Sequence, residues 1–298
     1  MAEINKDALI ELNNEYLSLK SEYSRLGKIK TLFRTVRKGT FFETLKIKLN
    51  RKKYYDNIKK KDVSIEELKT DTFFKPRIAV YMCVVGAYDR INEPVVLLEN
   101  AEYFIITDAT IPVSSKWKTI KIDMSKFEGY TAPQINRYYK LHPQEVFSEF
   151  DYTVYLDGNI RIISDFTDII FTMYRRDIDY ALFQHPDRDC IYTESNYLLA
   201  LTRFKKDWDS IKKQIIKYIA EGYPIHNGLY ENGILFRKNS KKVSDLMECW
   251  WDELNRSSFR DQISFPYVLW KQGWDDSDIM IIGNDLKNSC YFRYYAHV

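Results

Sequence analysis

Short apolar runs alternate with longer amphipathic segments between residues 76 and 282, and this alternation constrains the fold most. The apolar runs are rich in β-branched and aromatic residues, which is typical of buried strands. Residues 78–89 predict a buried strand that runs into a glycine-containing loop, and further strands are predicted at 103–108, 153–156, 180–183, 233–236 and 279–282. The segments between them predict helices at 134–147, 166–174, 194–203, 208–221, 243–254 and 262–270. This order favours an α/β fold: a three-layer domain with a mostly parallel sheet, whose ligands bind beyond the carboxyl ends of the strands.

Charge is distributed unevenly along the chain. Residues 1–61 contain 16 Lys+Arg and 7 Asp+Glu, although all 298 residues together carry a formal net charge of only +3. A strongly basic region therefore precedes an acidic remainder. We predict a basic amphipathic helical arm at 1–72 and a catalytic domain at 73–298.

The arm contains two kinds of amphipathic sequence. At 4–26, apolar residues recur every three to five positions, which predicts a helix that could form a homodimer. At 28–61, Lys and Arg alternate with aliphatic and aromatic residues, as in segments that lie on anionic membrane surfaces. The alternative is an arm that packs on its own domain or on a second subunit. Nucleic-acid binding is not expected, because no nucleic-acid module is recognisable elsewhere.

Cysteine usage and the N-terminal sequence indicate a compartment. The four cysteines are widely spaced and form no CxxC pair, which argues against a zinc site or a disulfide framework and fits a reducing cytosol. The N-terminus is polar and unlike a signal peptide, and the longest apolar run, around 78–85, is too short to span a bilayer. We expect a cytoplasmic protein, peripheral on the inner face of the membrane if the arm binds lipid.

Asp157-Gly158-Asn159 follows the predicted strand at 153–156 directly. A carboxylate and an amide oxygen two residues apart can turn toward one cation, and Mn²⁺ or Mg²⁺ takes such oxygen ligands together with substrate phosphates. The segment therefore predicts a metal site at Asp157 and Asn159. The alternative is a turn that joins two strands, since Asp, Gly and Asn are common turn residues.

Eight segments occur in a fixed order: VYMCVVGAYD, FIITD, NRYYKLHP, YLDGN, HPDRDCIYTE, LYENGILFRKN, CWWDEL and RDQISFPYVLW. Together, over residues 76–272, they resemble the turgor-regulation-defect/mucilage-related glycosyltransferase-like family. The resemblance implies a GT-A-like fold and a nucleotide-sugar donor. Asp157 and Asn159 then stand where GT-A enzymes carry their DxD motif, with Asn in place of the second Asp, and His297 stands where some GT-A folds place a C-terminal metal ligand.

The resemblance also suggests residues that bind the donor. Gly86 and Tyr88 follow the first strand, and Asp108, after the second, stands where GT-A enzymes often contact base or ribose. The Asn-Gly segment that many GT-A enzymes place beside the donor sugar corresponds to Asn232 and Gly233, for which a tight turn is the alternative.

Arg137 and Lys140 lie three residues apart on one face of a predicted helix, where they could neutralise a diphosphate. Surface salt bridges are the alternative explanation for this pair.

Candidate catalytic and acceptor-binding residues lie in three further segments. Asp261 and Gln262 open a helix; Asp261 is the first choice for gripping a donor-sugar hydroxyl or acting as base, and a helix N-cap is its alternative role. Glu231, before a predicted strand, is a second catalytic candidate. His185 is a third, with Arg188 and Glu194 as contacts to the acceptor or leaving group; an internal Arg188–Glu194 pair is their alternative.

The sequence therefore favours a glycosyltransferase that moves a sugar from a nucleotide-sugar donor to a glycan or lipid-linked acceptor, in bacterial surface polysaccharide synthesis. A divalent metal at Asp157 would stabilise the leaving diphosphate. The alternatives are a hydrolase on the same scaffold and a non-catalytic sugar- or nucleotide-binding module.

Overall fold

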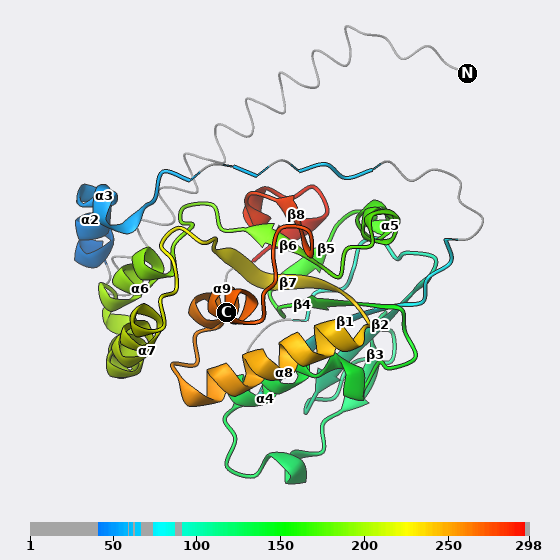
Figure 1. The fold of residues 1–298 in the computed structure, drawn as a ribbon. Coiled ribbons are helices and arrows are strands. Elements are labelled where there is room, and N and C mark those ends of the chain that lie inside the picture. Colours follow the sequence, from blue (N-terminus) through cyan, green and yellow to red (C-terminus); the bar gives the residue numbers. More distant parts are fainter. Residues whose placement is uncertain (1–40, 59, 62, 67–73, 87–90, 296–298) are drawn as a thin grey trace, which may run out of the picture.

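The computed structural model describes residues 41–295 except 59, 62, 67–73 and 87–90 (Figure 1). Within these residues the chain forms a seven-stranded sheet of order β3-β2-β1-β4-β7-β6-β8. Its strands are β1 (Ile78–Val84), β2 (Ala101–Thr107), β3 (Lys118–Lys121), β4 (Tyr152–Leu156), β6 (Tyr180–Gln184), β7 (Tyr230–Lys238) and β8 (Ile279–Gly283). Only β7 is antiparallel to its neighbours, so the predicted α/β class with a mostly parallel sheet is confirmed.

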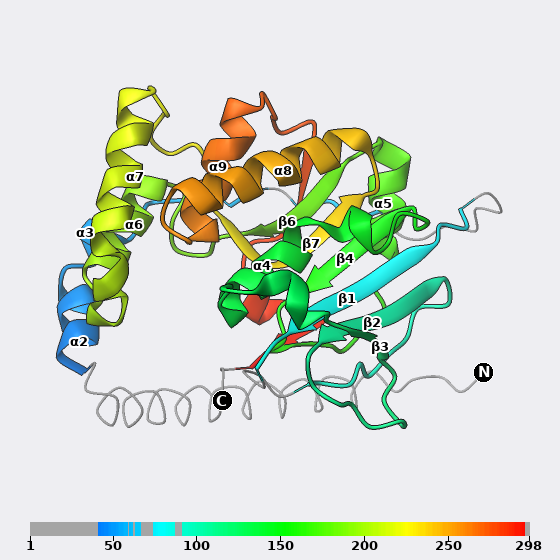
Figure 2. The same ribbon diagram turned by 90° about the horizontal axis from the view of Figure 1, so that it is seen from below.

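Helices and a small ribbon cover the two faces of the sheet (Figures 1 and 2). One side carries α4 (Ala132–Leu141), α6 (Ile191–Leu199), α7 (Trp208–Ala220), α8 (Lys241–Arg256) and α9 (Asp261–Lys271). The other carries α5 (Thr167–Arg176) and a ribbon of β5 (Ile160–Ile162) and β9 (Phe292–Tyr294). The sheet is therefore the middle of three layers.

The central strands are buried on both faces, which explains why they are continuous apolar runs in the sequence. In β1, Tyr81 and Cys83 belong to the core under α4 and α8, whereas Val80 and Met82 belong to the core under α5. Alternate side chains of a strand point to opposite faces, so one strand supplies both cores.

Most predicted elements are present with shifted ends. The helix predicted at 134–147 stops at Leu141, because Pro143 disfavours helical geometry at the residue before it. The strand predicted at 233–236 extends over Tyr230–Lys238, so Glu231 and Asn232 lie inside it rather than before it, and the tight turn considered as the alternative is wrong. The strands β3, β5 and β9 were not predicted.

The part of the arm that the structure describes packs on the domain. It forms α2 (Phe41–Leu49) and the short α3 (Arg51–Tyr54), and Ile47 and Tyr54 are buried with Leu201 at the end of α6. These contacts agree with the alternative in which the arm packs on its own domain. The division at residue 72 and the homodimer through 4–26 stay predictions, and residues 4–26 lie outside the described residues.

An extended segment then passes the ends of β6 and β8 and reaches α5, and we call its described residues, 55–58, 60, 61 and 63–66, the strap. Lys61 N donates to Gln184 Oε1 at 3.1 Å, and Asn284 Nδ2 donates to Lys61 O at 3.2 Å. Further on, Glu66 N donates to Thr172 Oγ1 at 2.9 Å. None of the helices among the described residues is long and apolar enough to cross a membrane.

Candidate active site

The site is organised around Asp157, the first residue after β4. Its backbone N–H donates to Gly233 O on β7 at 2.8 Å, and its carbonyl accepts from Ile160 N at 2.9 Å. Residues 157–159 thus form the turn between β4 and β5 that the alternative interpretation expected. The turn nevertheless leaves the Asp157 side chain 32% exposed at the edge of the sheet where β1, β2 and β4 also end.

Gly233 allows the β7 backbone to approach this carboxylate closely. A Cβ atom at position 233 would lie 3.3 Å from Asp157 Oδ2 and 3.1 Å from Ile160 Cδ1. Both distances are tighter than ordinary van der Waals contact, so a larger residue here would displace the carboxylate or the turn behind it.

Arg137 and Lys140 face the same place from α4. Lys140 Nζ lies 3.0 Å from Asp261 Oδ2 and 3.9 Å from Asp157 Oδ1, and Arg137 Nε lies 3.2 Å from Asp261 Oδ2. Because Lys140 is fully buried, the surface salt bridge expected as the alternative for this pair is wrong. The four residues form one group of two acids and two bases, which we call the charge cluster.

The position of α4 follows from its sequence. Thr131 and Gln134 form a capping box, and Pro133 occupies the first turn, so the helix begins at Ala132. Residues three apart then share a face, which directs both cations toward the first turn of α9.

Asp261 is the first residue of α9, and Arg260 occupies the N-cap position, so the N-cap role considered as the alternative for Asp261 is wrong. Burial alone would raise the pKa of its carboxyl, but Arg137 and Lys140 more than offset this and hold the pKa well below its usual range. Asp261 is therefore ionised and bridges α9 to α4. Gln262 follows it and is partly exposed.

Two residues of the site were not identified from the sequence. Tyr155 hydroxyl donates to Asp157 Oδ1 at 2.9 Å, and Asn136 Oδ1 accepts from Arg137 Nη1 at 2.7 Å. Asn136 Nδ2 also donates to Cys83 O at the end of β1, at 2.6 Å. The spacing of Tyr155 and Asp157 was an available signal, because residues two apart in a strand share a face.

Glu231 and Asn232 occupy the first half of β7. Glu231 Oε2 accepts from Leu286 N at 2.7 Å, and burial, as the main cause, raises the pKa of Glu231 to about 7. Asn232 is 4% exposed, and neither its amide nitrogen nor its oxygen has a hydrogen-bond partner among the described residues. A buried amide without partners costs stability, which is expected of a group that a ligand satisfies.

The neighbouring parallel strands β1 and β2 also end at this edge of the sheet. Gly86 N donates to Asp108 Oδ1 at 3.0 Å and to Oδ2 at 3.2 Å, and Gly86 has a φ of +68°. Asp108 therefore ties the loop after β1 to the end of β2. Tyr88 lies outside the described residues.

Asn159 contacts the C-terminal segment. Its Nδ2 donates to Tyr295 O at 2.8 Å, and its backbone O accepts from Tyr295 N at 2.9 Å. The side chain thus holds the end of β9 against the turn that carries Asp157. His297 lies outside the described residues.

His185, Arg188 and Glu194 form a separate buried network. The internal pair expected as their alternative is present, with Arg188 Nε 2.5 Å from Glu194 Oε2. His185 Nδ1 accepts from Asp187 N and Arg188 N, and burial, followed by the charge of Arg188, lowers the pKa of the imidazole to about 3. Arg188 also donates to Tyr54 O, so this network supports the loop and α3.

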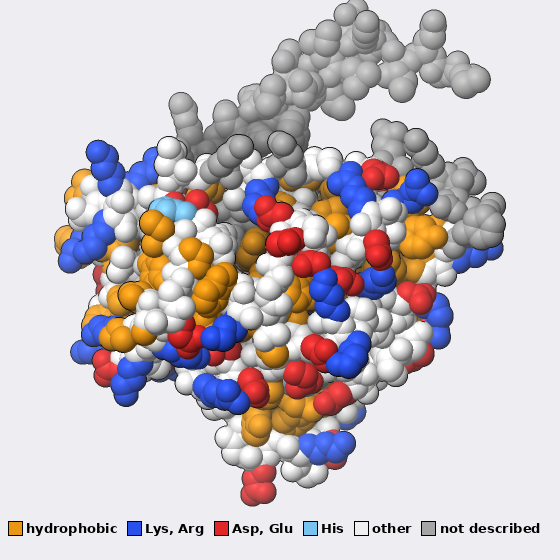
Figure 3. Space-filling model, viewed as in Figure 1, with side chains coloured by type: hydrophobic (Ala, Val, Ile, Leu, Met, Phe, Trp, Pro, Cys, Tyr) orange, Lys and Arg blue, Asp and Glu red, His pale blue; other side chains and the backbone are white. Residues whose placement is uncertain are grey.

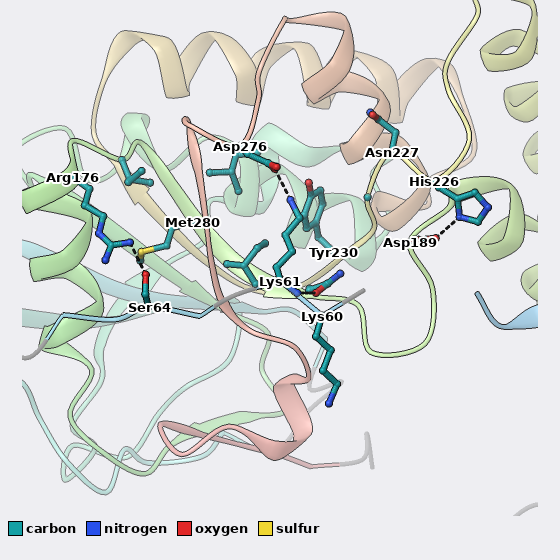
Figure 4. Close-up of a pocket in the computed structure, with 15 residues that line it drawn as sticks. Lys60, Lys61, Ser64, Arg176, Asp189, His226, Asn227, Tyr230, Asp276 and Met280 are labelled. Carbon is teal, nitrogen blue, oxygen red and sulfur yellow. Dashed lines mark hydrogen bonds and ion pairs between the residues drawn. The ribbon is translucent and has the colours of Figure 1, made fainter. Parts of the chain in front are cut away.

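A hollow of about 690 Å³ lies beside β8 under the strap (Figure 4). Most charged groups on its wall are paired, as Lys61 is with Asp276 at 2.5 Å and His226 with Asp189 at 2.6 Å. Asp56 of the strap completes a cluster with Asp189 and His226, and it accepts hydrogen bonds from Asp189 N and Thr193 Oγ1. These contacts fasten the strap to the loops before β7 and α6.

Structure comparison finds two solved structures with low similarity to this chain. A structure titled "WbbM bifunctional glycosytransferase apo structure" has a TM-score of 0.41 and 12% identity, covering 71% of this chain and 39% of the other. The mannosyltransferase Ktr4p from S. cerevisiae has a TM-score of 0.39 and 11% identity, covering 76% of this chain and 75% of the other.

Sequence comparison gives the family. The curated "Probable hexosyltransferase MUCI70" of Arabidopsis thaliana is 26% identical over 170 residues, which are 52% of this chain and 28% of that protein. The chain therefore matches less than a third of that relative's length. The family model described as "TOD1/MUCI70, glycosyltransferase-like domain" matches residues 27–293. Since this match spans most of the chain, including the whole charge cluster, the protein belongs to the TOD1/MUCI70 glycosyltransferase-like family.

Proposed function

We propose that the protein is a glycosyltransferase that moves a sugar from a nucleotide-sugar donor to a glycan or lipid-linked acceptor, in bacterial surface polysaccharide synthesis. The observation that carries the proposal is the charge cluster. It gathers Asp157, Lys140, Arg137 and Asp261 from three elements at the edge of the sheet where ligands of α/β proteins bind. Family membership supports the same reaction class.

A divalent cation, Mn²⁺ or Mg²⁺, fits Asp157 if Asp157 supplies one carboxylate ligand and the donor phosphates fill other coordination positions of the cation. Asp157 Oδ1 accepts from Tyr155, and the side chain is 32% exposed, so the carboxylate can still offer a lone pair to a cation. When bound, the cation would stabilise the charge that develops on the leaving diphosphate. Asn159 and His297 remain proposed as further ligands, and the contact of Asn159 with Tyr295 brings the two parts of the chain together.

Arg137 and Lys140 have different places in this proposal. Arg137 is 25% exposed and can offer its guanidinium to a phosphate oxygen while Asn136 holds one side of it. Lys140 is buried between two carboxylates, so it adds positive potential at the site and fixes the positions of Asp157 and Asp261.

Glu231 is the better candidate for the base that removes the acceptor proton. It is two residues before Gly233, and both positions face Leu286, which places it about 7 Å along β7 from the backbone beside Asp157. A pKa of about 7 suits proton exchange at neutral pH, whereas Asp261, held ionised by two cations, is a weak base.

Gly86, Asp108, Asn232, Gly233 and Gln262 are proposed to surround the donor. The unpartnered amide of Asn232 is the strongest member of this set, because a sugar hydroxyl can both donate to its oxygen and accept from its nitrogen. The hydroxyl would satisfy two groups that the folded chain leaves without partners.

We also propose that the basic arm at 28–61 contributes to attachment at an anionic membrane surface, where lipid-linked acceptors are found. The part of it that forms α2 and α3 is held against α6. Lipid contact by this part would therefore involve the domain as well as the arm.

The test is a thermal-shift screen of nucleotide sugars with and without Mn²⁺, followed by product analysis with the stabilising donor. We expect one nucleotide class to raise Tm in a metal-dependent way and the sugar to be transferred to an added glycan or lipid-linked acceptor. Release of free sugar alone would favour a hydrolase. Binding without any turnover would favour a non-catalytic binding module.

A further inference from the structure

One flank of the molecule combines basic and apolar side chains. It consists of α2 and α3 (residues 41–54), the 3-10 turn Thr202–Asp207 and α7, and we call it the basic flank. Figures 1 and 2 both place α2, α3 and α7 along the same side of the molecule. Contacts join its parts, since Thr202 N donates to Glu43 Oε1 at 3.3 Å and Leu201 packs with Ile47 and Tyr54.

The outer face of α7 exposes aliphatic side chains. The helix buries Ile211, Gln214 and Tyr218, but Ile216 is 66% exposed and Ile219 is 60% exposed. Three residues apart, these two isoleucines lie on one face of the helix. Leu49, at the end of α2, is 76% exposed.

Basic residues surround these aliphatic side chains. The basic flank contains 11 Lys+Arg, at positions 46, 48, 51, 52, 53, 203, 205, 206, 212, 213 and 217, against Glu43, Asp207 and Asp209. Within the described residues, only Lys212 and Lys217 of this set pair with a carboxylate. Figure 3 shows basic and hydrophobic side chains together at the left of the view, where Figure 1 has α2, α3 and α7. The rest of the chain is acidic on balance, because the whole chain is only +3.

We propose that the basic flank docks the protein on an anionic lipid surface, with Ile216 and Ile219 entering the headgroup region and the surrounding Lys and Arg contacting lipid phosphates. Clustered cations attract such a surface, and exposed aliphatic side chains on the same helix face add apolar burial. Lys212 and Lys213 lie about one helical turn before Ile216, so cations and aliphatic side chains share this part of α7, a combination that suits an anionic lipid surface.

This inference extends lipid contact from the arm to α7, an element of the domain itself. The docking proposal is independent of the proposed reaction, because it is tested by lipid binding and not by sugar transfer. Failure of the transfer assay would leave it standing, and failure of lipid binding would leave the transfer proposal standing.

The experiment is co-sedimentation of the full chain with liposomes of phosphatidylglycerol and phosphatidylcholine, and with phosphatidylcholine alone. We expect the wild type to bind only the anionic liposomes, and to be released when salt rises from about 0.05 M to about 0.5 M. K212E/K213E should weaken binding at least tenfold, since each cation near the surface contributes to affinity. I216S/I219S should weaken it about fivefold or more.

The matched control variants carry the same kinds of substitution, Lys to Glu and aliphatic residue to Ser, at exposed positions outside the basic flank. Lys75 and Lys126 are exposed and lie outside the basic flank, so K75E/K126E should lose much less binding than K212E/K213E. Val95 and Val113 are 51% and 105% exposed, so V95S/V113S should bind as the wild type does. Thermal unfolding of each variant checks that it is folded.

Three outcomes would overturn the proposal. The first is a wild type that ignores anionic liposomes at low salt. The second is loss of binding that is equal in the α7 variants and their controls. The third is an I216S/I219S variant that binds lipid normally but has a smaller mass by light scattering, which would identify the flank as a contact between copies of the chain.

Discussion

Asp157 shows how one residue can belong both to a turn and to a candidate site. Its backbone closes the turn into β5, while its side chain stays partly exposed beside Gly233 and Lys140. The two interpretations of Asp157-Gly158-Asn159 were therefore not exclusive. The turn fixes the direction in which the carboxylate points.

The first prediction concerns this carboxylate. Asp157→Ala and addition of EDTA should each weaken nucleoside diphosphate binding at least tenfold, because both remove the proposed metal bridge to the phosphates. Asn159→Asp should tighten Mn²⁺ binding, since a further negative charge raises affinity for hard cations. Isothermal titration with the diphosphate, with and without Mn²⁺, measures all three effects.

Asp168→Ala is the control, because Asp168 accepts from the Tyr291 hydroxyl on the other side of the sheet. Equal diphosphate affinity in wild type, Asp157→Ala and EDTA-treated protein would remove the metal role.

The second prediction concerns Glu231. Glu231→Gln should lower kcat by about 10²–10⁴-fold, the usual contribution of a general base. A base acts when deprotonated, so with a pKa raised to about 7 the wild-type rate should climb as pH rises through 7 and level off above it. The measurement is kcat/KM between pH 5 and 9, with the exposed Glu128→Gln as control. A rate that does not change below pH 7 would exclude Glu231 as the base.

At the scale of elements, the charge cluster joins α4 and α9 across the end of the sheet. Lys140 on α4 and Asp261 on α9 are 121 positions apart in sequence and 3.0 Å apart in space. The sequence predicted that Arg137 and Lys140 share a helix face, because helical spacing is local. It could not predict that Asp261 neutralises them, because that contact depends on how two helices pack.

The same limit applies to β7 and to the His185 loop. Strand formation at Gly233–Phe236 was predictable from its apolar residues, whereas Tyr230 and Glu231 pair with β6 across a register shift that no sequence pattern indicated. The internal Arg188–Glu194 pair, expected as the alternative for this loop, is present, but Glu194 lies in the first turn of α6 and not in the loop. Their contact with Tyr54 of the arm could not be read from local spacing.

The third prediction tests the bridge between these helices. Asp261→Asn should lower the free energy of unfolding by about 3–5 kcal/mol, because it leaves Lys140 buried with less compensating charge. If Asp261 also acts in the transfer step, transfer should fall while donor binding is largely kept, whereas a grip on the donor sugar would lower donor binding too. Chemical denaturation and transfer assays below the unfolding temperature separate the two effects.

The matched variant is Asp245→Asn, which breaks an exposed pair with Lys241 and should change stability by less than about 1 kcal/mol. Wild-type stability and turnover in Asp261→Asn would rule out both roles.

For the whole molecule, the described part of the arm completes the domain. α2 and α3 cover the end of α6, and the strap bonds to Gln184, Asn284 and Thr172 beside the edge strand β8. An uncovered edge strand presents unpaired backbone groups that other chains can pair with. The strap passes along this margin of the sheet, with the hollow of Figure 4 between it and β8, so it would hinder another chain from reaching the edge.

The last prediction follows from these contacts. A chain that begins at residue 72 would lose the buried Ile47 and Tyr54, the acceptor for Arg188 at Tyr54 O, and the strap. Losing two large buried side chains alone costs several kcal/mol, a large share of the stability of an ordinary domain. The shortened chain should therefore melt at least 10 °C lower, or aggregate through β8, whereas a chain beginning at residue 40 should keep these contacts. Differential scanning calorimetry and size-exclusion chromatography on the three lengths make the comparison, and a monomeric chain from residue 72 with the full-length Tm would show that residues 41–66 are dispensable for the fold.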